Sequence, residues 1–524
     1  MITIVEQFPV LIVTTGVFAG YTILLAGLLN RRSCFYIFLA TIFSHFIMSL
    51  FILHHVLTIG TIHYWLGGWR PPWGIEYVVD GLNAYVLIIV LLLSLIAAIY
   101  SKRSVEHELE GRKHVAFYTL FQLLVAGLCG VVVTGDMFNM YVLTEVASLT
   151  AYALIASAGG RALRASYNYL VLGSIGICFY LLGIGFLYSV TGSLNMGDLR
   201  ILLPPLYGNR VVQTAFIFVL IGLSIKCAFF PLHIWQPDAY TYAPSAVSVI
   251  IAAAMSKVSV YALIRVIYSI FTLDFISSYR YVEIAICWLA AIGIIAGSVL
   301  AIMQHNLKRM LAYSSISQIG YLVLGIGLSP ISISKIFLSG SSVVISWGLL
   351  GALAHLANHA IMKGCLFLAA GAFIYKYNLW DIRDFEGLGK KMPYASAAFT
   401  LAALSMIGVP PSTGFVSKLF LIYASLKATE VFSSAAYIFV GVLLLSSLLN
   451  LVYFWRVIER MYFVKREEQN GGEREKEAPL SMLLPMLLLA SLCVVVGILW
   501  LTQTPLPLIK NVMAELGVEA VLPP

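Results

Sequence analysis

Long apolar runs separated by short polar segments recur along almost the whole chain. Each run reaches about twenty residues, which is the length a helix needs to cross a hydrocarbon layer of about 30 Å. The pattern therefore predicts an all-α polytopic membrane protein with about fourteen transmembrane helices. The predicted spans are 9–29, 33–59, 79–100, 115–134, 137–157, 165–190, 212–231, 243–270, 283–303, 308–328, 342–376, 394–427, 434–463 and 479–503.

The two longest predicted spans, 342–376 and 394–427, exceed the length that a membrane requires, so breaks are expected in them. Helix-breaking residues precede the second of these spans at Gly387, Gly389 and Pro393, and interrupt it at Pro410, Pro411 and Gly414. A helix broken at membrane depth must line a cavity enclosed by protein, because lipid cannot satisfy its free backbone groups.

Basic residues gather on one set of alternating loops, for example at 31–32, 102–103 and 390–391. The positive-inside rule assigns that side to the cytoplasm and leaves both termini external. The net charge of +8 is therefore attributed to these loops and not to nucleic-acid binding. No basic region precedes the first apolar run, so the first helix is expected to be retained. The charged stretch 465–477 is expected to be a solvated, mobile loop.

The composition argues against several classes of function. Hydrophobic residues make up 60% of the chain and charged residues 11%, whereas about a quarter of the residues in a soluble domain are charged. The 7 cysteines fall in predicted spans without C-x2-C spacing, so iron–sulfur and zinc sites are not expected. No nucleotide-binding motif appears. We therefore expect no cofactor, no metal and no bond chemistry in this chain itself.

A small set of ionisable residues stands in otherwise apolar predicted spans. The set is Glu145, Lys226, Lys257, His355, His359, Lys363 and Lys418. A charge at the bilayer centre costs about 2.5–3.5 kcal/mol even on lenient scales, so each of these residues is a candidate for function. A buried lysine loses the hydration of its charged form and an approaching carboxylate compensates that loss, so its protonation can be switched. The set is interpreted as a relay for protons or cations.

The same residues allow structural alternatives. Glu145 and Lys226 could form a static ion pair between two helices, although several further lysines without an evident partner favour a relay. His355 and His359 could be buried core histidines or, with a third ligand, part of a metal site. The spacing H-x3-H lacks the glutamate of H-E-x2-H, which disfavours metal. Asp136 could cap the following helix or conduct.

Polar residues close to these groups are expected to order water between them. The supporting candidates are Asp136, His233, Ser314, Ser315 and Gln318. Arg265 lies near the end of a predicted span and could instead extend its side chain to the membrane interface.

The chain is predicted to divide into a three-helix segment at 1–114, five-helix repeats at 115–270 and 283–463, and a final part at 464–524 with a cytoplasmic loop, the last span and a tail. Each repeat carries a lysine, then a proline-interrupted stretch, then a second lysine. Copies with an odd number of spans must have opposite orientations, which predicts an inverted repeat with broken helices near the midplane.

Several sequence motifs carry a resemblance to a known family. They are T-G-D-M-F-N-M-Y-V-L-T-E (134–145), F-P-L-H-I-W-Q-P-D-A (230–239), A-P-S (243–245), S-K-V-S-V-Y-A-L-I-R (256–265), H-N-L-K-R-M-L-A-Y-S-S-I-S-Q-I-G-Y (305–321), H-A-I-M-K (359–363) and G-V-P-P-S-T-G-F-V-S-K (408–418). Over most of its length the chain resembles the antiporter-like, proton-translocating subunits shared by Mrp cation/proton antiporters, energy-converting membrane-bound hydrogenases and complex I. The first and fourth motifs look closer to the Mrp D and hydrogenase-type branch.

The resemblance implies fourteen helices, inverted five-helix repeats and half-channels joined by a polar central axis. The family's positions are matched by Glu145 on the fifth helix, Lys226 on the seventh, Lys257 on the eighth, His355, His359 and Lys363 on the eleventh, and Lys418 on the twelfth. Only a short tail follows Leu501, which argues against the distal complex I subunit with its long lateral helix.

The expected function is translocation of protons, with sodium as a possible coupled ion, by a subunit of a multisubunit complex in the cell membrane. The complex is expected to be an Mrp-type Na+/H+ antiporter, with membrane subunits alone, or a redox-driven pump with peripheral iron–sulfur or metal subunits. The alternative is a stand-alone transporter of an organic solute, which needs a pocket with aromatic and charged recognition groups. A third class, an intramembrane enzyme, needs clustered carboxylates or a metal, and the sequence offers neither.

Overall fold

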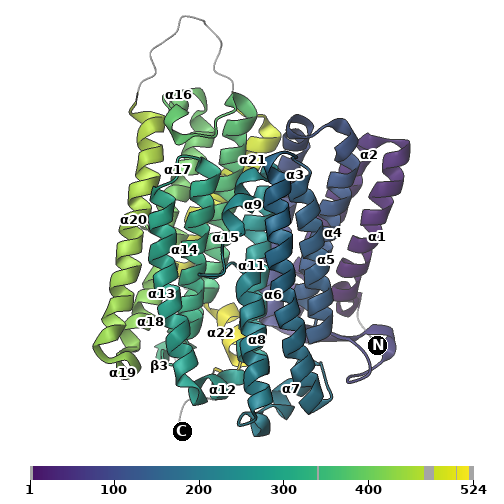
Figure 1. Ribbon diagram of the computed structural model, residues 1–524, viewed down its shortest axis with the longest axis vertical. Helices are drawn as coiled ribbons and strands as arrows, with labels where there is room; N and C mark the ends of the chain where they lie inside the picture. Colours follow the sequence, from purple (N-terminus) through teal and green to yellow (C-terminus); the bar gives the residue numbers. More distant parts are fainter. Residues whose placement is uncertain (1–3, 339–340, 465–476, 503, 519–524) are drawn as a thin grey trace, which may run out of the picture.

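A computed structural model describes residues 4–338, 341–464, 477–502 and 504–518. The long helices stand side by side along one axis and form a bundle (Figure 1). In the described part of the chain, 12 helical stretches are long and apolar enough to cross a membrane. This confirms the prediction of a polytopic, nearly all-helical membrane protein. Most of the predicted loop 465–477 and the last residues of the predicted tail, 519–524, lie outside the described residues.

The first half of the chain contains the following elements in order. They are η1 (Ile4–Gln7), α1 (Phe8–Leu29), α2 (Arg31–Thr58), β1 (Ile62–Trp65), η2 (Leu66–Gly68), β2 (Glu76–Val79), α3 (Gly81–Glu108), η3 (Gly111–Lys113), α4 (His114–Val133), α5 (Met137–Ala156), α6 (Arg161–Thr191), α7 (Met196–Leu202), η4 (Pro204–Leu206), α8 (Arg210–Lys226), α9 (Gln236–Tyr242), α10 (Ser245–Ile250), the π-helical η5 (Ile251–Met255), α11 (Ser256–Ile264) and the π-helical η6 (Arg265–Ile270).

The second half continues with α12 (Thr272–Ser278), α13 (Arg280–Ile302), α14 (Leu307–Gly327), β3 (Ile333–Leu338), β4 (Ser341–Ser346), α15 (Trp347–Tyr377), η7 (Ile382–Asp384), α16 (Leu388–Lys391), α17 (Pro393–Ile407), α18 (Thr413–Lys427), α19 (Thr429–Phe432), η8 (Ser433–Ala435), α20 (Ala436–Tyr462), α21 (Leu480–Leu501) and α22 (Leu506–Glu515). Both termini lie toward the same end of the bundle (Figure 1).

Side-chain caps fix where several spanning helices begin. Asp80, Asp136 and Asn306 each accept a hydrogen bond from a backbone N–H in the first turn of α3, α5 and α14 respectively. Such caps satisfy amides that have no partner within the helix. Asp136 thus caps the following helix, which is one of the two roles that the sequence allowed for it.

The two predicted spans outside the group of 12 are discontinuous. The span predicted at 212–231 ends as a helix at Lys226, and the chain then runs irregularly to α9. The span predicted at 394–427 is divided into α17 and α18 around residues 408–412, as its prolines predicted. Each break falls in the fourth segment of its half, which supports the inverted repeat; the division into repeats itself stays a prediction.

The break predicted in the span 342–376 was wrong, and an irregularity occurs in a different span instead. The helix α15 runs without interruption from Trp347 to Tyr377, because its glycines serve close packing: a Cβ at Gly364 would lie 2.8 Å from the Leu489 side chain. The span predicted at 243–270 contains the two π-helical segments η5 and η6, which the sequence analysis did not predict.

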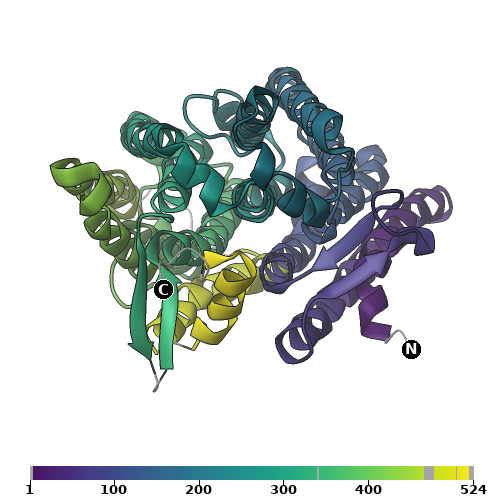
Figure 2. The same ribbon diagram turned by 90° about the horizontal axis from the view of Figure 1, so that it is seen from below.

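Two β-hairpins, which the sequence analysis did not predict, cover one end of the bundle. Strands β1 and β2 pair antiparallel, as do β3 and β4. Figure 2 shows both hairpins together with α22 at this end. Because 341–346 forms a strand, the eleventh span begins at Trp347 and not at the predicted 342.

The helix α15 is the centre of the protein. All its residues from Gly348 to Ile374 are buried, and it packs against α3, α10, α14, α17, α18 and α21. In contrast, α1, α2 and α20 lie at the edges, and most residues of their spans are exposed or half-buried. The histidines and the lysine of α15 therefore lie in the interior of the bundle and not toward lipid.

Candidate functional site

Glu145 on α5 and Lys226 on α8 form a direct ion pair inside the bundle. The Lys226 Nζ donates to Glu145 Oε1 at 2.9 Å and to Ser148 Oγ at 2.9 Å. The side chain of Lys226 is 2% exposed and that of Glu145 is 20% exposed. Lys226 is the last residue of α8, where the free carbonyls of a helix end favour a cation.

A glycine on α6 makes room for this pair. A Cβ at Gly173 would overlap the hydroxyl of Tyr152 and approach the Lys226 Nζ to 3.7 Å. The hydroxyl of Tyr152 therefore lies close to the ion pair. It packs directly against Gly173, where any side chain would displace it.

Lys257 on α11 has only neutral hydrogen-bond acceptors. Its Nζ donates to the Ala252 carbonyl at 2.6 Å and to Ser256 Oγ at 3.2 Å. Ala252 belongs to the π-helical segment η5, whose wider turn presents this carbonyl to the lysine. The side chain is 1% exposed, so a buried ammonium here depends on dipoles alone.

His355 and His359 stack on one stripe of α15. Their ring centroids are 5.9 Å apart, and His355 also stacks on Tyr321 at 5.4 Å. His355 Nδ1 lies 3.0 Å from Ser417 Oγ. Neither ring nitrogen of His359 has a hydrogen-bond partner among the described residues. In the same part of the chain, no group of three His, Cys, Asp or Glu side chains is placed to hold a metal ion.

Lys363 lies two turns beyond His355 and contacts α14. Its Nζ donates to the Leu311 carbonyl at 2.7 Å and to Ser314 Oγ at 2.9 Å. Lys257 is close enough to act electrostatically on Lys363 and on both histidines. Three titratable side chains of α15 and one lysine of α11 are therefore buried in one region, the central cluster, and Lys257 acts electrostatically on the other three.

Lys418 binds the end of a broken helix. Its Nζ donates to the carbonyls of Met406 and Ile407 at 2.8 and 3.0 Å, and to Ser447 Oγ at 3.1 Å. These are the last carbonyls of α17, which have no partner within the helix because the chain breaks after Ile407. The break thus creates the site that receives the lysine, and the charge of Lys418 also acts on His355.

The supporting candidates have different roles. Ser314 contacts Lys363, whereas Ser315 donates to the Leu311 carbonyl of its own helix at 3.0 Å. Gln318 is buried, and its amide has no partner among the described residues. His233 lies in the irregular segment after α8 and stacks on Phe230 at 5.2 Å.

The ion pair and the central cluster are separate. In the described chain no hydrogen bond or ion pair joins Lys226 to Lys257 directly. Tyr169 and Trp235 lie between the two regions, with ring centroids 3.7 Å apart. Trp235 donates to the carbonyl of Ile225, and the Tyr169 hydroxyl contacts the sulfur of Met255. A link between the two parts thus needs water or movement of this aromatic pair.

The expectation that Arg265 extends to the membrane interface was wrong. Its side chain is buried and binds the carboxylate of Asp80 and the amide oxygen of Asn83, both at the start of α3. A carboxylate close at hand removes the need for the guanidinium to reach water. No sequence signal pointed to this pair, because the partners are 185 positions apart.

The C-terminal helix α22 packs beside Arg265 and Asp80, outside the membrane spans. Glu515 Oε2 accepts a hydrogen bond from the Gly81 N–H at 2.8 Å, and Arg200 donates to the Glu515 carbonyl at 3.2 Å. Burial and the nearby charge of Asp80 raise the pKa of Glu515 to about 7, despite the opposing charge of Arg265.

The docking of α22 is therefore expected to weaken with rising pH. The raised pKa of Glu515 means that docking is firmest below the ordinary carboxyl value of about 4.3, and is lost progressively as pH rises to about 7. Hydrogen exchange of the α22 amides across this range measures the effect. Glu515→Gln should abolish the pH dependence; an unchanged pH dependence in that variant contradicts the assignment.

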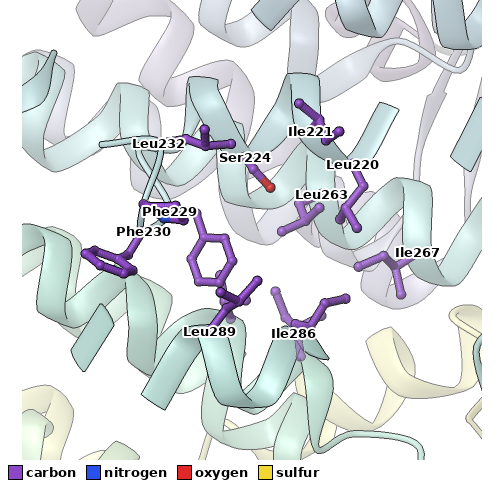
Figure 3. Close-up of a pocket in the computed structure, with 13 residues that line it drawn as sticks. Leu220, Ile221, Ser224, Phe229, Phe230, Leu232, Leu263, Ile267, Ile286 and Leu289 are labelled. Atoms are coloured by element: carbon purple, nitrogen blue, oxygen red, sulfur yellow. The ribbon is translucent and has the colours of Figure 1, made fainter. Parts of the chain in front are cut away.

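A pocket beside the break after α8 is almost wholly apolar. Figure 3 shows Leu220, Ile221, Phe229, Phe230 and Leu289 around it, with Ser224 the polar side chain drawn there. The pocket contains none of the titratable candidates and no charged group. It therefore offers no charged ligand for an ion and no charged recognition group for a solute.

Comparisons with known proteins identify the family of the chain. Residues 134–444 match the family described as NADH:quinone oxidoreductase/Mrp antiporter, transmembrane. The NADH-quinone oxidoreductase subunit N of Desulforudis audaxviator (strain MP104C) is 44% identical over 446 residues, covering 83% of this chain and 84% of the relative. The D subunit of the Na+/H+ antiporter of Bacillus subtilis (strain 168) is 30% identical over 458 residues, covering 87% of each.

Two solved structures share the fold. A chain of the membrane-bound sulfane sulfur reductase, an archaeal respiratory membrane complex, gives a TM-score of 0.85 at 29% identity and covers 98% of this chain and 100% of its own. A chain of the Mrp complex from Dietzia sp. DQ12-45-1b gives 0.84 at 24% identity, with full coverage of both. Since the family match spans more than half of the sequence and the relatives align over more than four-fifths of it, the chain belongs to the NADH:quinone oxidoreductase/Mrp antiporter transmembrane family.

Proposed function

We propose that this chain is the ion-translocating, antiporter-like subunit of a multisubunit membrane complex and that it moves protons through its interior. The observation that carries the proposal concerns the four candidate lysines, Lys226, Lys257, Lys363 and Lys418, all of which are buried. Only Lys226 among these four has a carboxylate partner in the described part of the chain. Lysines held by neutral oxygens can release a proton without leaving an unpaired carboxylate behind. Static structural ion pairs do not account for such a set.

The relay is proposed to run from Glu145 and Lys226 to the central cluster and on to Lys418. Between these points Gln236, Gln318 and His359 have buried polar atoms without a partner in the described part of the chain. Buried polar groups are normally satisfied by protein or by water. Water molecules at these three side chains would bridge the gaps between the titratable groups, in keeping with the supporting role proposed for Gln318.

We further propose that the complex lies in the plasma membrane, with the basic loops cytoplasmic and both termini external. This orientation rests on the distribution of Lys and Arg among the loops. The position of both termini toward one end of the bundle agrees with it.

A stand-alone transporter of an organic solute is less well supported. The pocket beside α8 has no charged recognition group, and the titratable residues are gathered along α15 and its neighbours instead. Relatives named as subunits of a quinone oxidoreductase and of a Na+/H+ antiporter support a multisubunit assembly. The partners of this chain would be further membrane subunits and, for a redox-driven complex, peripheral iron–sulfur or metal subunits. If the complex is an Mrp-type antiporter, sodium is the ion that is exchanged for protons.

Purification of the tagged chain from its native membrane tests the proposal. Other polytopic membrane subunits should co-purify in fixed stoichiometry, and the reconstituted complex should form a proton gradient when driven. Co-purifying iron–sulfur subunits indicate a redox-driven complex, and membrane subunits alone indicate an Mrp-type antiporter. A homogeneous single-subunit preparation that transports an organic solute overturns the proposal.

A further inference from the structure

A set of hydrogen bonds on α14 and α20 connects Lys363 to the carbonyl group that holds Lys418. Lys363 Nζ contacts Ser314 Oγ at 2.9 Å, and the Tyr453 hydroxyl lies 2.8 Å from the same oxygen. The Tyr453 hydroxyl also lies 2.8 Å from Asn450 Oδ1. Tyr453 and Asn450 are completely buried. Neither was a candidate from sequence, and neither titrates near neutrality.

The far end of this set meets Lys418 at one shared acceptor. Asn450 Nδ2 donates to the Met406 carbonyl at 3.3 Å, and Lys418 Nζ donates to the same carbonyl at 2.8 Å. A carbonyl only accepts, so the amide of Asn450 must present its nitrogen to Met406 and its oxygen to Tyr453. The orientation of this amide is thereby fixed by its partners.

The fixed amide gives the whole set one direction. Tyr453 has a single hydroxyl hydrogen, and Asn450 Oδ1 can only accept it. The Tyr453 oxygen then accepts from Ser314, and the Ser314 oxygen accepts from Lys363. Every donor therefore points away from Lys363, which is the arrangement that stabilises an ammonium at that end.

We propose that Tyr453 and Asn450 form a polarised bridge through which the protonation of Lys418 controls the protonation of Lys363; this inference rests on the proposed function. A charged Lys418 is a strong donor to the Met406 carbonyl and thereby weakens the bond that Asn450 makes to the same oxygen. A neutral Lys418 donates more weakly, so the bond from Asn450 becomes stronger. This makes Oδ1 a better acceptor and strengthens each bond back to Lys363, since hydrogen bonds in a chain polarise one another. The two lysines thus favour opposite protonation states. Tyr453 and Asn450 act as positioning residues, and no proton passes through the amide.

Removal of the one hydroxyl in the middle of the bridge is the direct test. Tyr453→Phe in the reconstituted complex should lower the rate of proton-gradient formation about fivefold, the effect of losing one hydrogen bond between neutral groups. The pH profile of the rate should change as well, because Lys363 then titrates independently of Lys418. Tyr268→Phe is the matched control: its hydroxyl is equally buried but donates to the Ile326 carbonyl at 3.2 Å, away from both lysines.

A double-variant cycle separates a bridge from a merely structural role. Ser314→Ala breaks the same connection, so Ser314→Ala combined with Tyr453→Phe should be no slower than the slower single variant. A double variant whose loss of rate equals the product of the two single losses overturns the inference, and so does an unchanged pH profile in Tyr453→Phe. Normal rates in Tyr453→Phe with loss in Lys363→Ala reject the bridge and leave the proposed function intact. Normal rates in both Lys363→Ala and Lys418→Ala reject the proposed function itself.

Discussion

Reconstituted complexes that carry Glu145→Gln or Lys226→Ala are expected to lose proton-gradient formation by at least about a hundredfold, the scale of losing a positioned proton donor or acceptor. Each change leaves the fold of α5 and α8 in place but removes one member of the 2.9 Å pair. Gradient formation in proteoliposomes, followed with a pH-sensitive dye, measures the loss, and co-purification of the partner subunits shows that assembly survives.

The two variants should differ in stability, and this difference checks the geometry. Glu145→Gln leaves the charge of Lys226 buried at 2% exposure, whereas Lys226→Ala leaves Glu145 at 20% exposure, where water can reach it. An unpaired buried charge costs about 3–5 kcal/mol, so Glu145→Gln should be the less stable of the two in thermal unfolding. Glu106→Gln, which breaks an exposed pair with Arg103, is the control and should change neither property. Normal gradient formation in both ion-pair variants contradicts the relay.

Lys257→Met is expected to abolish gradient formation while leaving the protein as stable as before or more stable. The ammonium of Lys257 is buried against a carbonyl and a hydroxyl, and no carboxylate of the described residues balances it. An unbranched apolar side chain of similar length removes that unfavourable burial. Loss of transport by about a hundredfold or more, with an equal or higher unfolding temperature, distinguishes a carrier from a structural lysine.

The control for this substitution is Lys427→Met. Lys427 ends α18 and is exposed, so its loss should affect neither transport nor stability. A Lys257→Met variant that unfolds at a markedly lower temperature assigns Lys257 a structural role. A variant that transports normally removes it from the relay.

Sequence pattern was sufficient to locate the spans and the titratable groups, because both are local properties. A helix in lipid needs an uninterrupted apolar run, and proline stops it, so the break before α18 was visible in V-P-P-S-T-G. Charged residues stand out in such runs at Lys226, Lys257 and Lys363. The structure buries all three, as their cost in lipid led us to expect.

The sequence pattern could not predict features that depend on partners distant in the chain. The π-helical segment that offers its carbonyl to Lys257 has no composition that marks it in advance. Arg265 was expected at the membrane interface because Asp80, its counter-charge, belongs to another helix. Tyr453 and Asn450 are ordinary polar residues in an apolar span until α14 and α17 are placed beside them.

The sequence by itself therefore determined that this is a polytopic helical protein of the antiporter-like type and which ionisable side chains it carries into the membrane, since hydropathy, proline and motif spacing are written along the chain. Only the tertiary structure decided which of those side chains meet. It joined Glu145 to Lys226, gathered Lys257 with α15, and set Lys418 on the open end of α17. The physical reason is that a hydrogen bond or ion pair is made at about 3 Å in space, a distance that packing fixes and sequence separation does not.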